Sequence, residues 1–359
     1  MRVSALTDLR CPVSGGSLRI DENIVRPKII NTQLGDDLQE GLLFCEESGK
    51  LYPVIAGVAI LVRKPLTYLA SNYYGIMTSA AGFIEADMVA YIEGGGVDLV
   101  SEGSQSAKYN TAANIALYIY HHYGDWFQQL PSDHPLGALM RHLDGDWLGK
   151  LIETVKNYSG LVDTALDVGC SVGGLVYKLA GFSSFVYGID YAFPSVLVAR
   201  SILLGQPKSL DCYRLPLTGT RYRTEQIRME RLTNVEIVVA SAESLPFVKG
   251  MFDVVTGANL VDRMGSPLEL VRAIDAVLRE DGLVLLTDPY DWRMAHSGIE
   301  DWIGGRVDSP SEEAMRGEME REFAILEEQD RIPWILYKNE REYTIFLNHC
   351  VVGKKLRRG

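Results

Sequence analysis

The stretch that most constrains the fold covers residues 165–174, which read A-L-D-V-G-C-S-V-G-G. Its apolar start and its glycines predict a buried parallel strand that passes through a glycine-rich loop into a helix N-terminus. Glycine is needed in such a loop because a side chain would hold the backbone away from a ligand. The free N–H groups of the first helical turn would then attract negative charge.

A carboxylate at the end of the next predicted strand completes this pattern. The strand predicted at residues 185–189 is followed directly by Asp190, which lies 23 residues after Asp167. An acidic residue about 20 residues past such a loop can accept hydrogen bonds from the hydroxyls of a ribose. The loop, the spacing and the carboxylate together predict a site for a nucleoside.

Composition and charge narrow the class of protein. The chain has 359 residues, of which 47% are hydrophobic, so it can bury a large core in two or three domains. A net charge of −12 disfavours nonspecific binding to nucleic acid. The 5 cysteines are scattered, and no apolar run is long enough to cross a bilayer. We therefore expect a cytoplasmic protein without a membrane partner.

The chain divides into three segments. Residues 1–65 predict a small β-rich domain, residues 66–160 a helical connector or lid, and residues 161–359 an alternation of strands and helices. Strands of the last segment are expected at 164–168, 185–189, 235–240, 252–257 and 282–287. This α/β pattern predicts a doubly wound, mostly parallel Rossmann-like sheet that binds ligands at the carboxyl ends of its strands. Apolar runs at 334–337 and 343–352 predict an added antiparallel hairpin.

The first segment carries a pattern of cysteines and turns. Cys11, Cys45 and the run Y-P-V at 52–54 resemble the zinc-ribbon-like domain of tRNA methyltransferase activator subunits. Metal-binding members carry Cys-x-x-Cys at both turns, whereas Ser14 and Ser48 stand at the second positions here. Because serine is a poor zinc ligand, we expect no metal and a domain held by packing.

Three motifs of the last segment follow one another in order. The glycine loop with Asp190 is followed by A-S-A-E-S-L-P-F at 240–247 and by F-D-V-V-T-G-A-N-L at 252–260. This succession resembles the class I S-adenosylmethionine-dependent methyltransferases over about residues 160–290. The resemblance implies S-adenosylmethionine as the cofactor. It implies the following cofactor-binding residues: Asp167, Gly169, Cys170, Ser171, Gly173, Asp190, Tyr191, Ser241, Ala242, Glu243 and Ala258.

The resemblance assigns parts of the cofactor to these residues, with two departures. The glycine loop would pass its methionyl part, Asp190 would take the ribose, and Ser241 would lie at the adenine. Ser171 replaces the usual middle glycine of the loop, and Ser241 replaces a usual aspartate. A dehydrogenase is the main alternative. Its signature G-x-G-x-x-G is absent, because the next glycines after Gly169 are Gly173 and Gly174, and a pyrophosphate would meet the Ser171 side chain.

A narrower resemblance lies outside these common motifs. The runs A-N-L-V-D-R at 258–263, T-D-P-Y-D-W at 287–292 and D-W-I-G-G at 301–305 are similar to the methyltransferase domain of ovothiol-biosynthesis enzymes. Residues 118–124 share the resemblance, which extends over roughly residues 110–350. It implies a small-molecule substrate: methylation of an imidazole nitrogen of a thiol-bearing histidine (4-mercaptohistidine).

Candidate catalytic residues follow the carboxyl ends of the fourth and fifth strands. Asn259 and Tyr290 are predicted to position the substrate, while Asp262 and Arg263 could bind the ammonium and carboxylate of an amino acid. His296 is a further candidate base. For each of these residues, capping or surface pairing stays the alternative.

Substrate-binding residues are expected at Tyr118, His122 and Trp292. Residues 112–123 predict an aromatic helix that either packs into the core or covers the cofactor pocket. Adjacent His121 and His122 face different directions on a helix, so they cannot form a metal pair. Cys170 is expected to pack rather than to act as a nucleophile.

Two other functions stay open. The first domain could dock a protein or RNA substrate for methylation, or the chain could be a catalytically silent cofactor-binding scaffold. A homodimer is an open alternative for its assembly.

Overall fold

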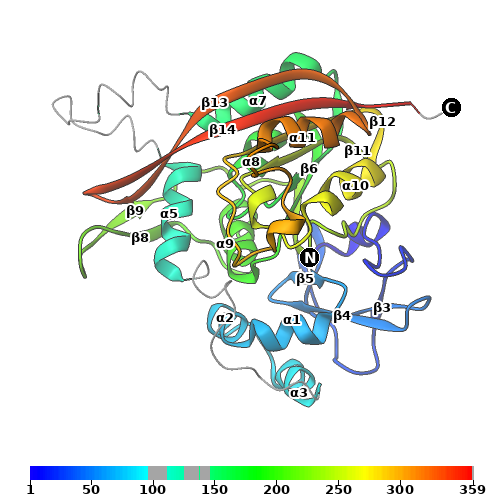
Figure 1. Cartoon of the computed structure of the whole chain (residues 1–359). Helices are drawn as coiled ribbons and strands as arrows, with labels where there is room; N and C mark the ends of the chain where they lie inside the picture. The colour runs from blue at the N-terminus through cyan, green and yellow to red at the C-terminus, as the bar shows by residue number, and fades with distance from the viewer. Residues whose placement is uncertain (96–110, 125–136, 138–145, 358–359) are drawn as a thin grey trace.

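The computed structural model describes residues 1–95, 111–124, 137 and 146–357. Within them, twelve strands form one sheet that runs through the whole molecule (Figure 1). Its central part has the order β10-β7-β6-β11-β12, and all of these strands are parallel. They are β6 (Val162–Val168), β7 (Ser183–Asp190), β10 (Val235–Ala240), β11 (Phe252–Ala258) and β12 (Leu278–Asp288). All five predicted parallel strands are therefore confirmed.

Helices cover both faces of this central sheet. Neighbouring residues of β7 point to opposite faces: Val186 packs in the cluster of α8 and α9, and Tyr187 in the cluster of α10 and α11. Helix α7 packs on the first of these faces against α8. The helices are α7 (Trp147–Tyr158), α8 (Gly174–Ala180), α9 (Phe193–Leu203), α10 (Pro267–Val277) and α11 (Ser311–Glu320). The fold is thus doubly wound, as predicted.

The C-terminal hairpin is confirmed and is longer than expected. Strands β13 (Phe323–Asn339) and β14 (Glu342–Lys355) pair with each other, and β14 lies antiparallel to β12. The sequence hid the first half of β13 because residues 325–331 are mostly polar. Such side chains suit a strand at the edge of a sheet, where both faces can meet water.

The N-terminal strands continue the same sheet. Strand β5 pairs in parallel with β10, with Ile60 opposite Val239 and Leu61 opposite Ala240. The N-terminal strands pair with one another in antiparallel fashion, in the spatial order β1-β3-β4-β5, and β2 also pairs with β3. Their bounds are β1 (Arg19–Asp21), β2 (Lys28–Thr32), β3 (Gly35–Cys45), β4 (Lys50–Ile55) and β5 (Val58–Leu61). The division into segments 1–65, 66–160 and 161–359 stays a prediction, and the sheet joins the first segment to the last.

The side chains of the two N-terminal turns lie close together. The sulfur of Cys11 lies 3.3 Å from Oγ of Ser48 and 3.0 Å from the Tyr52 hydroxyl. On the other side, Oγ of Ser14 lies 3.4 Å from the sulfur of Cys45. Burial raises the pKa of Cys11, but hydrogen bonds outweigh it and lower the pKa to about 6. Among the described residues, no three His, Cys, Asp or Glu side chains are grouped to hold a metal ion.

The described helices of the middle segment lie in two places: three lie together near the N-terminal strands, and the fourth lies apart from them (Figure 1). The described ones are α1 (Pro65–Ser71), α2 (Tyr73–Ser79), α3 (Ala86–Gly94) and α5 (Ala112–Tyr123). Helix α5 has the bounds that the sequence predicted, whereas most residues between α5 and α7 lie outside the described ranges. A small hairpin that the sequence did not predict, β8 (Cys212–Pro216) with β9 (Tyr222–Gln226), contacts α5. None of the helices in the described ranges is long and apolar enough to cross a membrane.

Candidate active site

The loop after β6 forms the centre of the site. Gly169 and Gly173 have φ values of 77° and 89°, which are left-handed conformations that favour glycine. Ser171 also has a positive φ, 50°, so the position where serine replaces glycine is strained. A Cβ atom on Gly173 would lie 2.8 Å from Cδ1 of Leu203, which leaves glycine as the residue that fits between the loop and α9.

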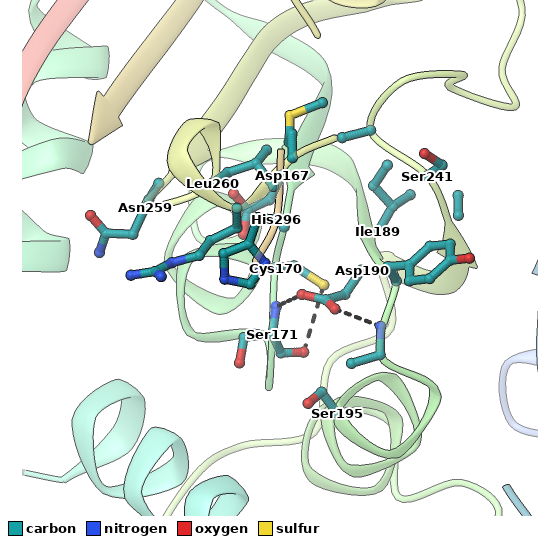
Figure 2. Close-up of a pocket in the computed structure, with 18 of the residues that line it drawn as sticks. Asp167, Cys170, Ser171, Ile189, Asp190, Ser195, Ser241, Asn259, Leu260 and His296 are labelled. Carbon is teal, nitrogen blue, oxygen red and sulfur yellow. Dashed lines mark hydrogen bonds between the residues drawn. The ribbon is translucent and has the colours of Figure 1, made fainter. Parts of the chain in front are cut away.

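Asp190 lies directly against this loop. One of its carboxylate oxygens accepts a hydrogen bond from the backbone N of Ser171 at 2.9 Å, and the other from that of Ala192 at 2.8 Å (Figure 2). Burial raises the pKa of this carboxyl. Because each carboxylate oxygen offers more than one acceptor site, the group can still receive hydroxyl donors from a ligand.

Asp167 lies deeper, at the end of β6. Its Oδ1 accepts a hydrogen bond from the Thr256 hydroxyl at 2.9 Å. Burial raises its pKa to about 7, with the nearby Asp190 adding to the rise. A cationic ligand group beside Asp167 would lower that pKa again, because an opposite charge favours the carboxylate.

A cavity of about 940 Å³ opens at the carboxyl ends of the strands and contains most of the predicted site. In Figure 2, Asp190 and Ser241 lie on one side, Asn259 lies on the other, and His296 lies between them. The predicted residues that line it are Tyr118, His122, Asp167, Gly169, Cys170, Ser171, Asp190, Tyr191, Ser241, Ala242, Glu243, Ala258, Asn259, Arg263 and His296. Cys170 is buried, and burial raises the pKa of its thiol.

Four predicted residues are not among those that line the cavity: Gly173, Asp262, Tyr290 and Trp292. Asp262 is buried and accepts a hydrogen bond from the backbone N of Asp291 at 2.9 Å. The Tyr290 hydroxyl lies 2.8 Å from Nδ1 of His349, and its ring stacks on Trp292. These contacts tie the loop after β12 to neighbouring elements, and the roles predicted for Asp262, Tyr290 and Trp292 stay predictions.

Helix α5 closes one side of the cavity. Its two histidines accept hydrogen bonds from two different elements. Nδ1 of His122 accepts a hydrogen bond from the backbone N of Gly174 at 2.9 Å, at the start of α8. Nε2 of His121 accepts one from the backbone N of Tyr337 on β13 at 2.7 Å. Burial lowers the pKa of His121 to about 4 and that of His122 to about 3, so both rings are neutral. The helix therefore serves as both a core element and a cavity wall.

These two histidines should make the fold sensitive to acid. Their folded-state pKa values lie below the ordinary 6.5, so the unfolded chain binds more protons as the pH falls. The stability present above pH 6.5 is then lost progressively toward pH 4. We expect about 2 kcal/mol of loss per histidine between about pH 7 and 5.

Denaturant unfolding at these two pH values measures the effect. Asp167 has a raised pKa and acts in the opposite direction, so the informative comparison is between variants. The His121→Gln and His122→Gln proteins should each lose less stability on acidification than the unmodified protein. An unchanged pH slope in the double variant would contradict this account.

Asn259 is held by a residue that sequence reasoning missed. Its φ is 53°, and its backbone N donates to the carbonyl oxygen of Thr287 at 2.7 Å. Its Oδ1 accepts a hydrogen bond from Nδ2 of the fully buried Asn348 on β14 at 2.5 Å. The hairpin thus sets the orientation of the Asn259 amide in the cavity.

The hairpin and α7 also supply a wall of aromatic rings to the cavity. The Trp334 ring lies 5.6 Å from that of Trp147 and 5.0 Å from that of Phe346, measured between centroids. All three residues line the cavity. No local motif marked them, because the rings come from segments far apart in the chain. Trp334 and Phe346 do lie in the two apolar runs, 334–337 and 343–352, that predicted the hairpin.

Comparisons with known proteins agree with this fold. A family described as "Methyltransferase domain" matches residues 166–286. The ubiquinone biosynthesis O-methyltransferase of Glaesserella parasuis is 25% identical over 122 residues, which are 34% of this chain and 43% of that protein. The uncharacterized methyltransferase YcgJ of Bacillus subtilis is 26% identical over 147 residues, 41% of this chain and 48% of its own length. The chain thus spans under half the length of these curated relatives.

Among solved structures, the N-methyltransferase NodS of Bradyrhizobium japonicum, in complex with S-adenosyl-L-homocysteine, is 13% identical. The match covers 69% of this chain and 100% of that one, with a TM-score of 0.40.

Proposed function

We propose that this chain, whose residues 166–286 form a class I S-adenosylmethionine-dependent methyltransferase domain, is an active methyltransferase for a small imidazole substrate such as a thiol-bearing histidine. The observation that carries the proposal is a single cavity. It joins the glycine loop and Asp190 at one end to the aromatic rings of Trp147, Trp334 and Phe346. At about 940 Å³, it is near the upper end of ligand pockets and has room for a cofactor together with a small substrate.

The residues present fit S-adenosylmethionine. The left-handed Gly169 lines the cavity without a side chain, so a ligand can approach the backbone there, and Asp190 retains acceptor sites for ribose hydroxyls. Ser241, which lines the same side, offers a hydroxyl near the expected adenine, and Asp167 offers a carboxylate near the expected methionyl part. When bound, the cofactor would supply a methyl group on a cationic sulfur.

Aromatic side chains favour a flat substrate. Offset rings such as Trp334 and Phe346, whose planes are 25° apart, present a face on which a further ring can stack. A neutral imidazole has one ring nitrogen with an available lone pair and one N–H. The Asn259 amide, which lines the same cavity, can hydrogen-bond such a ring and hold the reacting nitrogen in line.

His296 is placed to take the proton that the imidazole loses. Burial, together with the nearby Arg263 and Arg293, lowers the pKa of His296, so its ring is neutral near pH 7. A neutral imidazole in the cavity can accept a proton, whereas a charged one cannot. His296 lines the cavity together with Asn259, so it is within the same space as the proposed substrate.

Labelled S-adenosylmethionine incubated with a panel of imidazoles tests the proposal. We expect label in 4-mercaptohistidine or a close relative, with little in imidazole-free amino acids. The Asn259→Ala variant should lower turnover while binding S-adenosylhomocysteine normally, because Asn259 faces the substrate side. Label found in protein or RNA alone would replace this proposal by a macromolecular substrate, and no label in any acceptor would indicate a silent scaffold.

A further inference from the structure

We propose that Lys338 on β13, together with Arg263 and Arg293, forms a subsite for the carboxylate of the substrate, and that Lys338 sets the preference for acids. The inference rests on the proposed function and names the group that the far end of the substrate carries. All three cationic side chains line the cavity and come from different parts of the chain. Lys338 belongs to the hairpin, Arg263 to the turn after β11, and Arg293 to the loop after β12.

The two arginines already have carboxylate partners. Nε of Arg263 lies 3.1 Å from Oδ1 of Asp262, and its Nη2 lies 3.2 Å from Oδ2 of Asp291. Arg293 lies 2.6 Å from the same Oδ2 of Asp291. These ion pairs hold the arginines in position, and Asp291 neutralises part of their charge.

Lys338 differs from them in its surroundings. Burial lowers the pKa of its ammonium; Glu342 raises it, and Arg293 and Arg263 lower it further. Within the residues that the structure describes, the Lys338 ammonium makes no ion pair or hydrogen bond. A half-buried ammonium beside two guanidinium groups is unfavourable unless an anion joins them. An anionic ligand group in the cavity would supply that partner.

The geometry of β13 favours a carboxylate over a substituent on the ring. Trp334, Leu336 and Lys338 are alternate residues of one strand, and all three line the cavity. At about 3.3 Å per residue, the Cα atoms of Trp334 and Lys338 are about 13 Å apart, and Lys338 lies where the pairing of β13 with β14 shifts register, between Tyr337 and Asn339. A substrate whose ring stacks on the Trp334 side and whose amino-acid side chain extends along β13 would bring its carboxylate toward Lys338. A carboxylate there would also be in reach of the arginine pair.

Binding to protein loaded with S-adenosylhomocysteine tests the subsite without turnover. Calorimetry would compare 4-mercaptohistidine and histidine with histamine, which lacks the carboxylate. We expect the acids to bind at least about 10-fold more tightly than the amine, and Lys338→Met to remove most of that difference. Lys338→Arg should retain it. Lys354→Met makes the same change on β14, where the lysine pairs with Asp281 at the surface, and should behave as the unmodified protein.

Two further measurements separate this subsite from the proposed function. In turnover assays, Lys338→Met should raise KM for the acid about 10-fold or more with kcat changed far less, and should leave the affinity for S-adenosylhomocysteine unchanged. Calorimetric titration of 3-phenylpropionate and of its amide tests the subsite with ligands that contain no imidazole. If the acid is favoured through Lys338 while no imidazole is methylated, the subsite stands and the proposed substrate falls. Equal or absent binding of acid and amide, or full discrimination in Lys338→Met, overturns the subsite.

Discussion

Replacing Asp190 by alanine is expected to weaken the binding of S-adenosylmethionine and S-adenosylhomocysteine by about 1.5–3 kcal/mol, which is roughly 10- to 150-fold. The variant removes the carboxylate that we propose as the acceptor for the ribose hydroxyls. It also leaves the backbone N–H groups of Ser171 and Ala192 without the carboxylate that now binds them at 2.9 and 2.8 Å. The loss therefore includes both a ligand contact and the order of the glycine loop.

Calorimetry with both cofactor forms measures this effect. Asp163→Ala is the matched control, because Asp163 is an exposed carboxylate at the opposite end of β6. It should leave affinity unchanged. Asp190→Asn should also bind weakly, since one of its two backbone N–H partners would face an amide NH₂. Normal affinity in a folded Asp190→Ala protein would remove the basis for placing the cofactor here.

Replacing Arg200 by methionine is expected to destabilise the protein by about 3–5 kcal/mol. Arg200 on α9 is fully buried and pairs with Glu236 on β10 and, at 3.2 Å, with Asp37 on β3. The α-amino group of Met1 also donates to Asp37 at 3.0 Å, and Arg2 donates to the carbonyl oxygen of Val235 at 2.9 Å. Without Arg200, two carboxylates would remain buried with too little positive charge.

The charges of this cluster explain why the loss should be large. Burial raises the pKa of Asp37, but the hydrogen bond from the α-amino group and the charge of Arg200 outweigh it and hold the pKa below its ordinary value. Burial also lowers the pKa of the α-amino group to about 5, so this group is largely neutral near pH 7. Arg200 and Arg2 are then the cations that balance Asp37 and Glu236. Removing one of the two leaves an uncompensated buried charge.

Denaturant unfolding of Arg200→Met measures this contribution. Arg272→Met removes an exposed arginine that pairs with Glu269 within α10, and should change stability by at most about 0.5 kcal/mol. The triple variant Arg200→Met, Glu236→Met, Asp37→Leu should recover part of the loss, because it removes the unpaired carboxylates as well. A loss below about 1 kcal/mol in Arg200→Met would show that the cluster does not join the N-terminal strands to α9 and β10.

Three of the predicted residues lie outside the cavity lining for a shared physical reason. Asp262, Tyr290 and Trp292 follow strand ends, where the sequence correctly placed them near the ligand-binding edge. In a loop, the direction of a side chain depends on the packing around it. Here the carboxylate of the buried Asp288 accepts hydrogen bonds from the backbone N of Val261 and from that of Tyr290. These two bonds tie the loops after β11 and β12 together.

The sequence by itself determined the parallel strands, the glycine loop and the position of Asp190, because these depend on local backbone conformation and on apolar patterns within a few residues. It also indicated α5 and the C-terminal hairpin. Only the tertiary structure decided that β5 extends the sheet through β10, and that Trp334 and Lys338 enter the cavity more than a hundred residues after the loop. Such contacts arise from the pairing of distant strands, which local spacing does not record.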